Sequence, residues 1–444
     1  MNLVYGVSDK PKFGQLLVFA FQQILAILAA TIAVPSIIGN GMSQAAALLG
    51  AGVGTLVYQL FTKFRSPVFL GSSFAFIASM FAAFGGAASA SAGYAGLILG
   101  AVFAGLVYVV IAIVIKCVGV QWINKLMPPV VIGPTVAIIG MSLAPNAVGD
   151  LFLGKVLVDD VSACSPYVAL ICGLATLFAV VLFSVCGKKM MKLIPFILGI
   201  LVGYVVATIF TVIGIATDNI ALQVINFAAF KDMRLVSLPE FTFLEAAKGL
   251  KDIDGAFIAT VAVAYIPVAF VVFAEHIADH KNLSSIIGSD LLENPGLHRT
   301  LLGDGIGSMV GAFFGGCPNT TYGESVGCVA ITRNASVVTI LTTAILCIAI
   351  SFFDPFVTFL ASIPNCVMGG VCITLYGFIA VSGLKMIQQV NLGASKNLFV
   401  VAIILICGIG GLSVSFGQVT LTSIACALIL GIIANAALSK AKED

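Results

Sequence analysis

The stretch Pro318-Asn319-Thr320-Thr321-Tyr322-Gly323-Glu324 interrupts the apolar second half of the chain, and Gly71-Ser72-Ser73-Phe74-Ala75-Phe76 interrupts the first half in the same way. Irregular backbone is tolerated inside a membrane only where protein or a water-filled cavity covers its free N–H and C=O groups. Matching interrupted segments in two halves of a chain point to a transporter substrate site near the centre of the membrane. The alternative is a pair of ordinary glycine-rich packing helices, and the ionisable Glu324 weighs against it in the second stretch.

The composition around these stretches is that of an integral membrane protein. Of the 444 residues, 60% are hydrophobic and only 9% are charged, and the mean hydropathy is +1.15. Ordinary soluble domains carry about 25% charged residues. Apolar runs of transmembrane length recur along the chain. The first run, 16–38, follows a polar start and is too long for the hydrophobic part of a signal peptide.

Charge and cysteine usage exclude several other classes. A net charge of +2 gives no reason to expect a nucleic-acid or anionic-lipid partner. The eleven cysteines include no CxxC pair, and almost all of them lie in apolar runs. We therefore expect buried thiols rather than a disulfide framework or a metal site.

The apolar runs divide into fourteen predicted spans, so the predicted fold class is an all-α polytopic membrane protein. The first seven spans are 14–38, 43–62, 68–84, 93–116, 129–147, 165–186 and 193–216. The second seven are 255–277, 299–315, 322–332, 336–353, 357–381, 397–413 and 418–438. The third and tenth spans contain the two interrupted stretches.

The basic residues support this number of spans. With a cytoplasmic N-terminus, 16 of the 21 Lys and Arg residues fall in inner loops and 5 in outer loops, as the positive-inside rule expects. Four of the five outer residues lie in one long loop, 217–254, where charge is least informative. Because seven is odd, two related halves of seven spans must have opposite orientations in the membrane. The sequence therefore predicts two inverted seven-span repeats, each broken at its third span.

Four acidic residues lie at membrane depth in the second half, namely Glu275, Asp279, Asp304 and Glu324. A charge at the bilayer centre costs about 2.5–3.5 kcal/mol even on the mildest scale, so such residues usually line a functional polar cavity. Glu275 and Asp279 share one helical face, and two carboxylates so close in an apolar site cannot easily both be ionised. This pair is a candidate for proton uptake. Asp304 has no basic neighbour in the sequence, and it can be protonated, paired or part of a proton path.

His276 and His280 repeat the same spacing on an adjoining face of the segment. A helical histidine pair of this spacing can bind a metal, but a third ligand is not evident. We favour solvated polar residues at the point where the segment leaves the membrane toward Lys281. No metal and no cofactor are expected.

Glu324 follows the second interruption directly, at the start of a half-helix. A carboxylate there accepts hydrogen bonds from a ligand, while free backbone N–H groups bind ligand carbonyls. Phe74 and Tyr322 place flat faces next to these polar groups. A planar heterocycle with N–H and C=O groups on one edge would satisfy both features, although core packing alone also explains Phe74.

At these residues the chain resembles the nucleobase–ascorbate transporter family, also called nucleobase:cation symporter-2, and most closely its branch of bacterial uracil permeases. The resembling stretches run nearly end to end, and they are GVSDKPKFGQ, FQQILAILAATIAVP, LGSSFAFI, AEHIADH, NPGLHRTLLGDGIGS and CPNTTYGESVGCVAITR. The last contains the family signature, which reads Glu324-x-x-Gly327-x-x-x-x-Thr332-Arg333 here. Together these motifs are highly specific.

The resemblance implies an architecture of fourteen spans in two inverted repeats, with short β-strands in the broken third and tenth spans. The implied core domain consists of 14–116 and 255–353, and the implied gate domain consists of 129–216 and 357–438. The segment 217–254 would be an extracytoplasmic loop. A homodimer through the gate domains is implied, in the bacterial cytoplasmic (inner) membrane with both termini in the cytoplasm.

The resemblance also implies uracil uptake with a proton by alternating access. The implied substrate-binding residues are Glu275, Glu324, Phe74 and Tyr322, with backbone groups at Gly323 and Ala30 and an influence of Ser325. The implied proton-coupling residues are Asp279, Glu275 and Asp304. Tyr376 would lie on the gate side of the pocket.

Three departures from the family pattern leave parts of this reading open. Asp279 stands where some uracil permeases carry histidine, so the residue that relays the proton is open. Ser325 stands where asparagine is usual, so purine selectivity is open. Gln22-Gln23 stands where the family often has Gln-His, which removes a family histidine.

Two alternative functions follow from these observations. The first is a xanthine or other purine:proton symporter of the same family. The second is an anion exchanger or channel of similar architecture, which acidic side chains in the site disfavour. An enzyme is not expected, because the sequence shows no nucleophile–base pair and no phosphate-binding loop.

Overall fold

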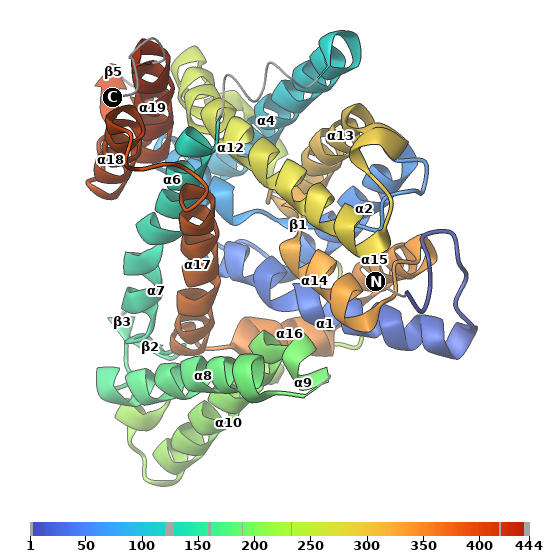
Figure 1. Ribbon diagram of the computed structural model, residues 1–444. Coiled ribbons are helices and arrows are strands. Elements are labelled where there is room, and N and C mark those ends of the chain that lie inside the picture. The colour runs from blue at the N-terminus through green and yellow to red at the C-terminus, as the bar shows by residue number, and fades with distance from the viewer. Residues whose placement is uncertain are drawn as a thin grey trace.

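The computed structural model describes residues 3–119, 128–158, 161–188, 190–231, 233–416 and 419–438, and the protein is mostly helical (Figure 1). Four of the basic residues assigned to inner loops, Lys125, Lys189, Lys440 and Lys442, lie outside these ranges.

The first half of the chain consists of helices joined by short connections. Proline stands in the first turn of α6, α8 and α10, where its missing N–H has no helical partner to lose. The elements are α1 (Phe13–Ile38), α2 (Gln44–Phe61), β1 (Leu70–Ser72), the short helix η1 (Phe74–Phe76), α3 (Ile77–Gly85), α4 (Ala90–Val118), α6 (Pro129–Ser142), α7 (Ala144–Asp150), β2 (Leu157–Val158), β3 (Val161–Ser162), α8 (Pro166–Cys186), α9 (Met190–Leu193) and α10 (Pro195–Ala216).

The second half begins with the longest helix, α12, whose N-cap Asp254 accepts a hydrogen bond from the backbone N–H of Phe257. The elements are α12 (Gly255–Ile287), η5 (Leu292–Gly296), α13 (Leu297–Gly315), β4 (Asn319–Thr321), α14 (Gly323–Thr332), α15 (Val337–Ser351), α16 (Asp354–Ser362), α17 (Asn365–Ile387), α18 (Ser395–Ile409), β5 (Val414–Phe416), β6 (Val419–Leu421) and α19 (Ser423–Leu438).

Four predicted spans differ from the helices observed. The fifth, expected over 129–147, is divided into α6 and α7, and the fourteenth, expected over 418–438, includes strand β6 before α19. The eighth was expected to end at residue 277, but α12 continues to Ile287, so the acids and histidines lie inside a helix. The twelfth was expected over 357–381, but the structure has two helices there, α16 and α17. Pro364 is the N-cap of α17, and a proline cannot donate the N–H bond needed to continue the preceding helix.

The described residues contain eight helices long and apolar enough to cross a membrane. Four shorter apolar helical stretches accompany them, at Phe74–Gly85, Val337–Ser351, Ser395–Ile409 and Ser423–Leu438. Large apolar side chains are exposed along the outer helices, for example Ile406 at 72% and Phe178 at 61%. Apolar side chains exposed in this way fit a lipid environment, so the chain is a multi-pass membrane protein.

The helices pack as two groups (Figure 1). We call α1–α4 with α12–α15 the core group, and α6–α10 with α17–α19 the gate group. In the core group, α13 packs on α2 and α4, and α12 packs on α4. In the gate group, α17 packs on α6 and α8, and α18 packs on α6 and α19.

The two interrupted stretches meet inside the core group. Strands β1 and β4 pair antiparallel, with Leu70 opposite Thr321 and Ser72 opposite Asn319. Two further backbone bonds extend the pair, from Ser73 N to the Pro318 carbonyl (2.9 Å) and from Tyr322 N to the Phe69 carbonyl (3.2 Å). Each interruption thereby satisfies part of the free backbone groups of the other, and side chains satisfy more of them, for example the Thr55 hydroxyl that accepts from Leu70 N.

Close helix contacts hold this strand pair in place. A Cβ on Gly50 of α2 would lie 2.4 Å from the carbonyl oxygen of Gly311 on α13, and one on Gly54 would lie 2.7 Å from that of Gly307. Only glycine permits so close an approach of two helices. Asn319 of β4 fits into the same contact and donates to the Gly50 carbonyl at 2.9 Å.

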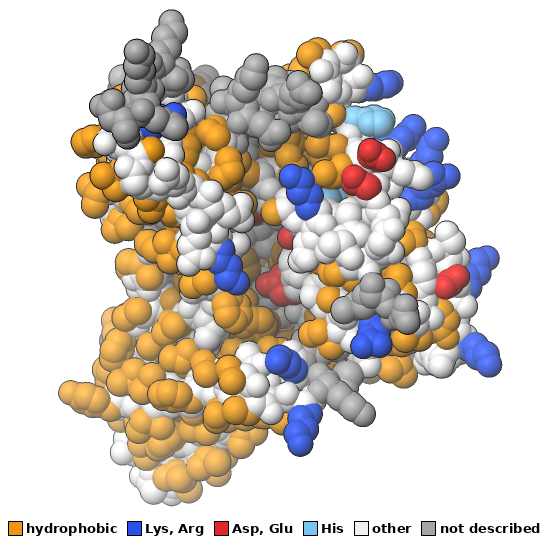
Figure 2. Space-filling view, viewed as in Figure 1, with side chains coloured by type: hydrophobic (Ala, Val, Ile, Leu, Met, Phe, Trp, Pro, Cys, Tyr) orange, Lys and Arg blue, Asp and Glu red, His pale blue; other side chains and the backbone are white. Residues whose placement is uncertain are grey.

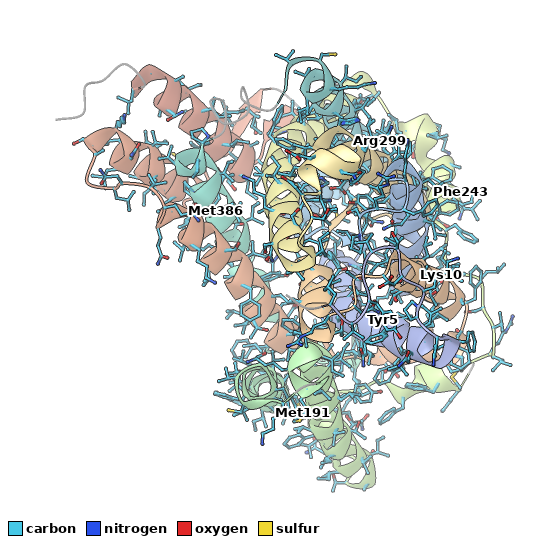
Figure 3. The ribbon with its side chains drawn as sticks, turned by 45° about the vertical axis from the view of Figure 1, so that its right-hand side comes forward. Tyr5, Lys10, Met191, Phe243, Arg299 and Met386 are labelled. Atoms are coloured by element: carbon cyan, nitrogen blue, oxygen red, sulfur yellow. The ribbon has the colours of Figure 1, made fainter. Side chains whose placement is uncertain are left out.

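The N-terminal segment folds back over the core group. The backbone N–H of Ala335 donates to the carbonyl of Tyr5, and that of Val337 donates to Val7. The Tyr5 hydroxyl donates to Gln15 at the start of α1. Figure 3 shows Tyr5 and Lys10 beside α1. This segment therefore connects the start of α1 with the turn between α14 and α15.

The long connection between α10 and α12 is ordered in its described part. It contains η2 (Ile220–Leu222), η3 (Phe227–Phe230), α11 (Thr242–Gly249) and η4 (Leu250–Asp252), and α11 packs on α4. Asp354, at the start of α16, accepts hydrogen bonds from the backbone of Arg234 (2.6 Å) and from the Ser237 hydroxyl (2.9 Å). Two of the connections between the core and gate groups, α10 to α12 and α15 to α17, are thus joined to each other at Asp354.

Candidate substrate site

A cavity of about 430 Å³ lies between the core and gate groups. Figure 2 shows a hollow at the centre of one face of the molecule, with acidic side chains visible inside it. Among the core-group residues lining the cavity are Ser73, Phe74, Glu275, Asp279, Thr320, Thr321, Tyr322, Gly323 and Glu324. The gate-group residues are Val136, Ile139, Phe196, Leu375, Phe378, Ile379, Ser382 and Met386.

The two sides of the cavity differ in chemistry. We call the core side the polar wall, because it carries three carboxylates and three hydroxyl side chains as well as two aromatic rings. We call the gate side the apolar wall, because Ser382 is its one polar side chain among the described residues. A ligand with several hydrogen-bonding groups therefore finds most of its partners on the core group.

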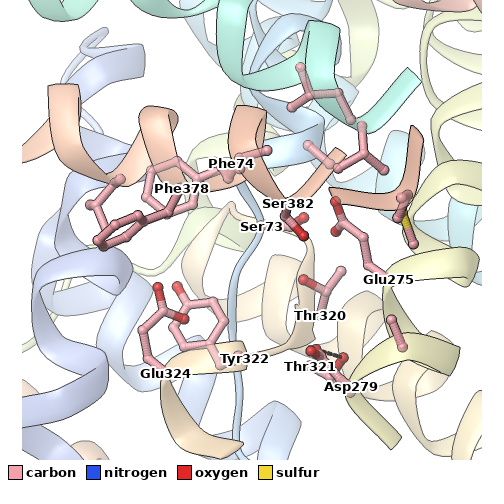
Figure 4. A pocket seen from close by; sticks show the side chains of 18 of the residues that line it. Ser73, Phe74, Glu275, Asp279, Thr320, Thr321, Tyr322, Glu324, Phe378 and Ser382 are labelled. Carbon is pink, nitrogen blue, oxygen red and sulfur yellow. Dashed lines mark hydrogen bonds between the residues drawn. The ribbon is translucent and has the colours of Figure 1, made fainter. Parts of the chain in front are cut away.

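The strand pair builds the centre of the polar wall. Tyr322 follows β4 and points back to β1, where its hydroxyl donates to the Ser72 carbonyl at 2.8 Å. That hydroxyl also lies 3.5 Å from the hydroxyl of Thr31 on α1. These contacts fix the orientation of the Tyr322 ring, which lines the cavity beside the strand pair (Figure 4).

The three carboxylates approach the cavity from two helices. Glu275 and Asp279 lie one turn apart on α12, and the Thr321 hydroxyl donates to Asp279 at 2.8 Å (Figure 4). Glu324 lies in the first turn of α14, where the helix dipole favours a negative charge. In the view of Figure 4, Glu324 lies on one side of the strand pair, and Glu275 and Asp279 lie on the other.

Aromatic rings from both groups meet at the edge of the cavity. Phe74 packs edge-on against Tyr376, with ring centroids 5.9 Å apart and an interplanar angle of 79°. Phe378, on α17, is 57% exposed and lines the cavity beside Phe74 (Figure 4). A flat ligand can therefore lie against aromatic faces while its edge meets the polar wall.

The structure brings six of the predicted site residues to the cavity and leaves four behind it. Those lining it are Glu275, Asp279, Glu324, Phe74, Tyr322 and Gly323. Ala30 is buried and packs in the same apolar cluster as Tyr322. Ser325 is also buried, where its hydroxyl accepts hydrogen bonds from Gln23 and from the Phe69 backbone (3.2 Å). Tyr376 is buried with its ring against Phe74, and Asp304 is buried on α13 against His276.

The expectation that His276 and His280 are solvated is wrong. Both side chains are 0% exposed, because α12 continues past them and side chains of α13 and α2 contact their rings. Their rings stack with centroids 4.0 Å apart. The ring nitrogens of His276 contact Asp304 (2.7 Å) and Thr300 (2.9 Å), so they are occupied by protein partners rather than open to a metal.

Several cavity residues were missed by the sequence analysis. Thr320 and Thr321 belong to the quoted interruption, and their polar side chains within an apolar run were the signal that could have found them. Ser73 also lies in a quoted stretch. Phe378 and Ser382 lie in an apolar helix far from any motif, so the sequence alone carried no signal for them.

Comparison with known proteins identifies a family and relatives that match nearly the whole chain. A sequence model of the permease family matches residues 14–416. The uracil permease of Bacillus caldolyticus is 37% identical over 435 residues, covering 97% of this chain and 94% of that protein. The uracil permease of Bacillus subtilis (strain 168) is 35% identical over 443 residues, covering 99% and 96%.

A solved structure shares the fold at low sequence identity. The transmembrane domain of a cyanobacterium bicarbonate transporter, BicA, matches with a TM-score of 0.65 and 16% identity, covering 97% of this chain and 100% of that one. Its fold is therefore the fold of this chain.

Proposed function

The chain belongs to the permease family, and from this premise we propose that it takes up uracil together with a proton. The observation that carries the proposal is the polar wall, where three carboxylates flank a strand pair beside aromatic rings. The similar proteins named uracil permeases support the choice of substrate. Their similarity covers nearly the whole chain.

The chemistry of uracil fits the polar wall. The ring is planar, and its edge carries two N–H donors and two carbonyl acceptors. Glu275 and Glu324 accept the N–H groups, and the hydroxyls of Ser73 and Thr320 together with the backbone N–H groups at the start of α14 serve the carbonyls. Phe74 and Phe378 cover the ring faces.

Proton coupling follows from the spacing of Glu275 and Asp279. Two carboxylates one turn apart in a largely apolar cavity repel each other when both are charged. Entry of one proton removes the repulsion, and uracil then completes the hydrogen bonds of the site. The empty carrier thus binds a proton before it binds uracil. This order couples the movement of the proton to the movement of uracil.

In this proposal, the core group moves against the gate group and thereby opens the cavity to each side of the membrane in turn. The fourteen spans form two inverted repeats in this proposal, with both termini in the cytoplasm and the chain in the bacterial inner membrane. The protein acts as a homodimer through its gate groups, without a cofactor and without enzymatic activity. The core carries the ligand, since nearly all polar partners belong to it.

Two other classes of substrate, anions and purines, are considered beside uracil. The fold shared with a bicarbonate transporter favours an anion, but one fold hosts many functions, and three acids in the cavity oppose an anion. A purine is kept as the second candidate because Ser325 replaces the usual asparagine of the family signature.

Thermal unfolding of the purified protein with uracil, thymine, xanthine, ascorbate or bicarbonate, at acid and neutral pH, tests the proposal. We expect stabilisation by uracil, larger at acid pH, because a ligand that binds the folded state raises its stability. Stabilisation by xanthine alone would overturn the substrate, and stabilisation by bicarbonate alone would overturn the class of cargo.

A further inference from the structure

A second polar cluster lies behind the polar wall and is closed to the cavity. It contains six side chains, each 0% exposed, from α2, the segment after α2, α12 and α13. These are Tyr58, Ser66, His276, His280, Thr300 and Asp304. The proposed function uses the adjoining face of α12, which carries Glu275 and Asp279, and leaves this cluster without a role.

The hydrogen-bond directions at His276 are assigned from its neighbours. The Thr300 hydroxyl donates its single proton to the Leu297 carbonyl at 3.0 Å. With its proton placed in this way, it accepts from His276 Nε2, which lies 2.9 Å away. His276 Nε2 carries a hydrogen, and its other nitrogen, Nδ1, faces Asp304 Oδ2 at 2.7 Å.

One proton must lie between Asp304 and His276. Either the carboxylic acid donates to a neutral Nδ1, or a protonated imidazole donates to the carboxylate. Without that proton, a carboxylate oxygen and a nitrogen lone pair would face each other at 2.7 Å in a buried site, which is strongly unfavourable. The pair keeps one proton for as long as the contact exists.

His280 is held as a neutral ring by a similar argument. Its Nδ1 lies 2.8 Å from the His276 carbonyl, which can only accept, so Nδ1 carries the hydrogen. Its Nε2 accepts from the Tyr58 hydroxyl at 2.7 Å, and that hydroxyl accepts from Ser66 at 2.7 Å. The stacked His276 ring and the edge of Tyr108, 6.3 Å from His276 between centroids, complete the surroundings. This series of hydrogen bonds connects α12 to α2.

We propose that His276 and Asp304 form a positioning pair for transport, which holds one proton throughout the cycle and fixes the rotation of α12. His276 follows Glu275 directly, so the two side chains point about 100° apart around the helix. Any rotation of α12 that separated the pair would also move Glu275 and Asp279 out of the cavity. The inference rests on the proposed uracil uptake, and it assigns the transported proton to the cavity acids rather than to Asp304.

The protonation states can be read without any transport assay. The chain contains three histidines, so nitrogen-15 labelling of histidine gives three sets of ring signals, and His298→Gln and His280→Gln assign them. We expect His276 to show a protonated Nε2 that does not titrate between about pH 5 and about pH 8, with or without uracil. A His276 signal that titrates in this range overturns the proposal.

Asp304→Asn tests the role in transport, with Asp304→Ala for comparison and Ser308→Ala, on the same helix, as control. An asparagine amide donates to neutral Nδ1 as the acid does, but it cannot release a proton. We expect the Asn variant to keep uracil accumulation within about threefold and an unchanged pH profile, and the Ala variant to lose about tenfold or more in uracil affinity.

Two transport assays, exchange and proton-driven accumulation, distinguish a failure of this inference from a failure of the proposed function. If Asp304→Asn still exchanges labelled for unlabelled uracil but no longer accumulates it on a proton gradient, Asp304 relays the proton and the proposal is wrong. If wild type neither binds nor carries uracil, the proposed function fails instead, and the histidine signals still decide whether the pair holds its proton.

Discussion

Glu275 is the carboxylate on which the proposed coupling depends most directly. It lines the cavity on the same helical face as Asp279, and Asp279 already accepts a hydrogen bond from the Thr321 hydroxyl. Substituting Glu275→Gln keeps the size of the side chain but removes both its charge and its proton exchange. We therefore expect proton-driven uracil uptake to be abolished, as measured with labelled uracil in proteoliposomes carrying a pH gradient.

A control for this substitution is available far from the cavity. Glu293→Gln changes an exposed acid that does not line the site, so uptake should stay near that of wild type. Uptake by Glu275→Gln within twofold of wild type, at equal protein level, would contradict the assigned role.

Sequence reasoning identified the residues whose chemistry is unusual for a membrane interior. An acid such as Glu324 is conspicuous there because burying it is costly, and it does line the cavity. Ser382 and Phe378 are ordinary for a membrane helix, so composition does not mark them. The pairing of Asp304 with His276 joins residues on two helices, and a single sequence does not show which helix faces contact each other.

The strand pair β1–β4 is the element that shapes the centre of the site. A Cβ on Gly71 of β1 would lie 2.4 Å from Cε2 and Cζ of Tyr322. Gly71→Ala must therefore displace the Tyr322 ring, which lines the cavity. We expect uracil affinity to fall about tenfold, measured by binding to the purified protein, because an overpacked contact moves side chains by tenths of an ångström or more.

Gly327→Ala is the matched control, because a Cβ at that position meets nothing within 4 Å. Alanine also favours a helix over glycine by up to about 1 kcal/mol, so α14 should be no less stable. If both alanine variants bind uracil as wild type does, the Tyr322 ring does not shape the site.

The elements themselves were predicted unevenly. The two interruptions were visible because small and polar residues break an apolar run. The register that places Leu70 opposite Thr321 depends on glycine contacts between α2 and α13, which no local pattern encodes. The extension of α12 to Ile287 was missed, because His276, Asp279 and His280 look in the sequence like the end of a membrane segment. In the structure, side chains of α13 and α2 contact the two histidines, and Asp279 lines the cavity.

Across the molecule, the division between polar and apolar walls coincides with the division between core and gate groups. Hydropathy alone predicted a membrane protein with broken spans, since that property is summed over long runs. It did not show which helices face each other across the cavity. That arrangement gives the proposed movement a physical basis, because a core that carries nearly all of the ligand's hydrogen bonds breaks few of them when it moves past an apolar gate.

Ile379 on α17 tests this interpretation, because it lines the apolar wall and is partly exposed to the cavity. Threonine and valine have nearly the same shape and differ by one hydroxyl group, so Ile379→Thr and Ile379→Val form a matched pair. A hydroxyl on the gate offers bound uracil a hydrogen bond that must break when the core moves. Such a bond stabilises the bound state without helping the movement. We expect the Thr variant to bind uracil at least as tightly as the Val variant but to exchange it several-fold more slowly, as measured by binding and by counterflow in the same preparations. Equal exchange rates in the two variants would show that the gate wall does not have to be apolar, and the core would then not be the sole carrier of the ligand.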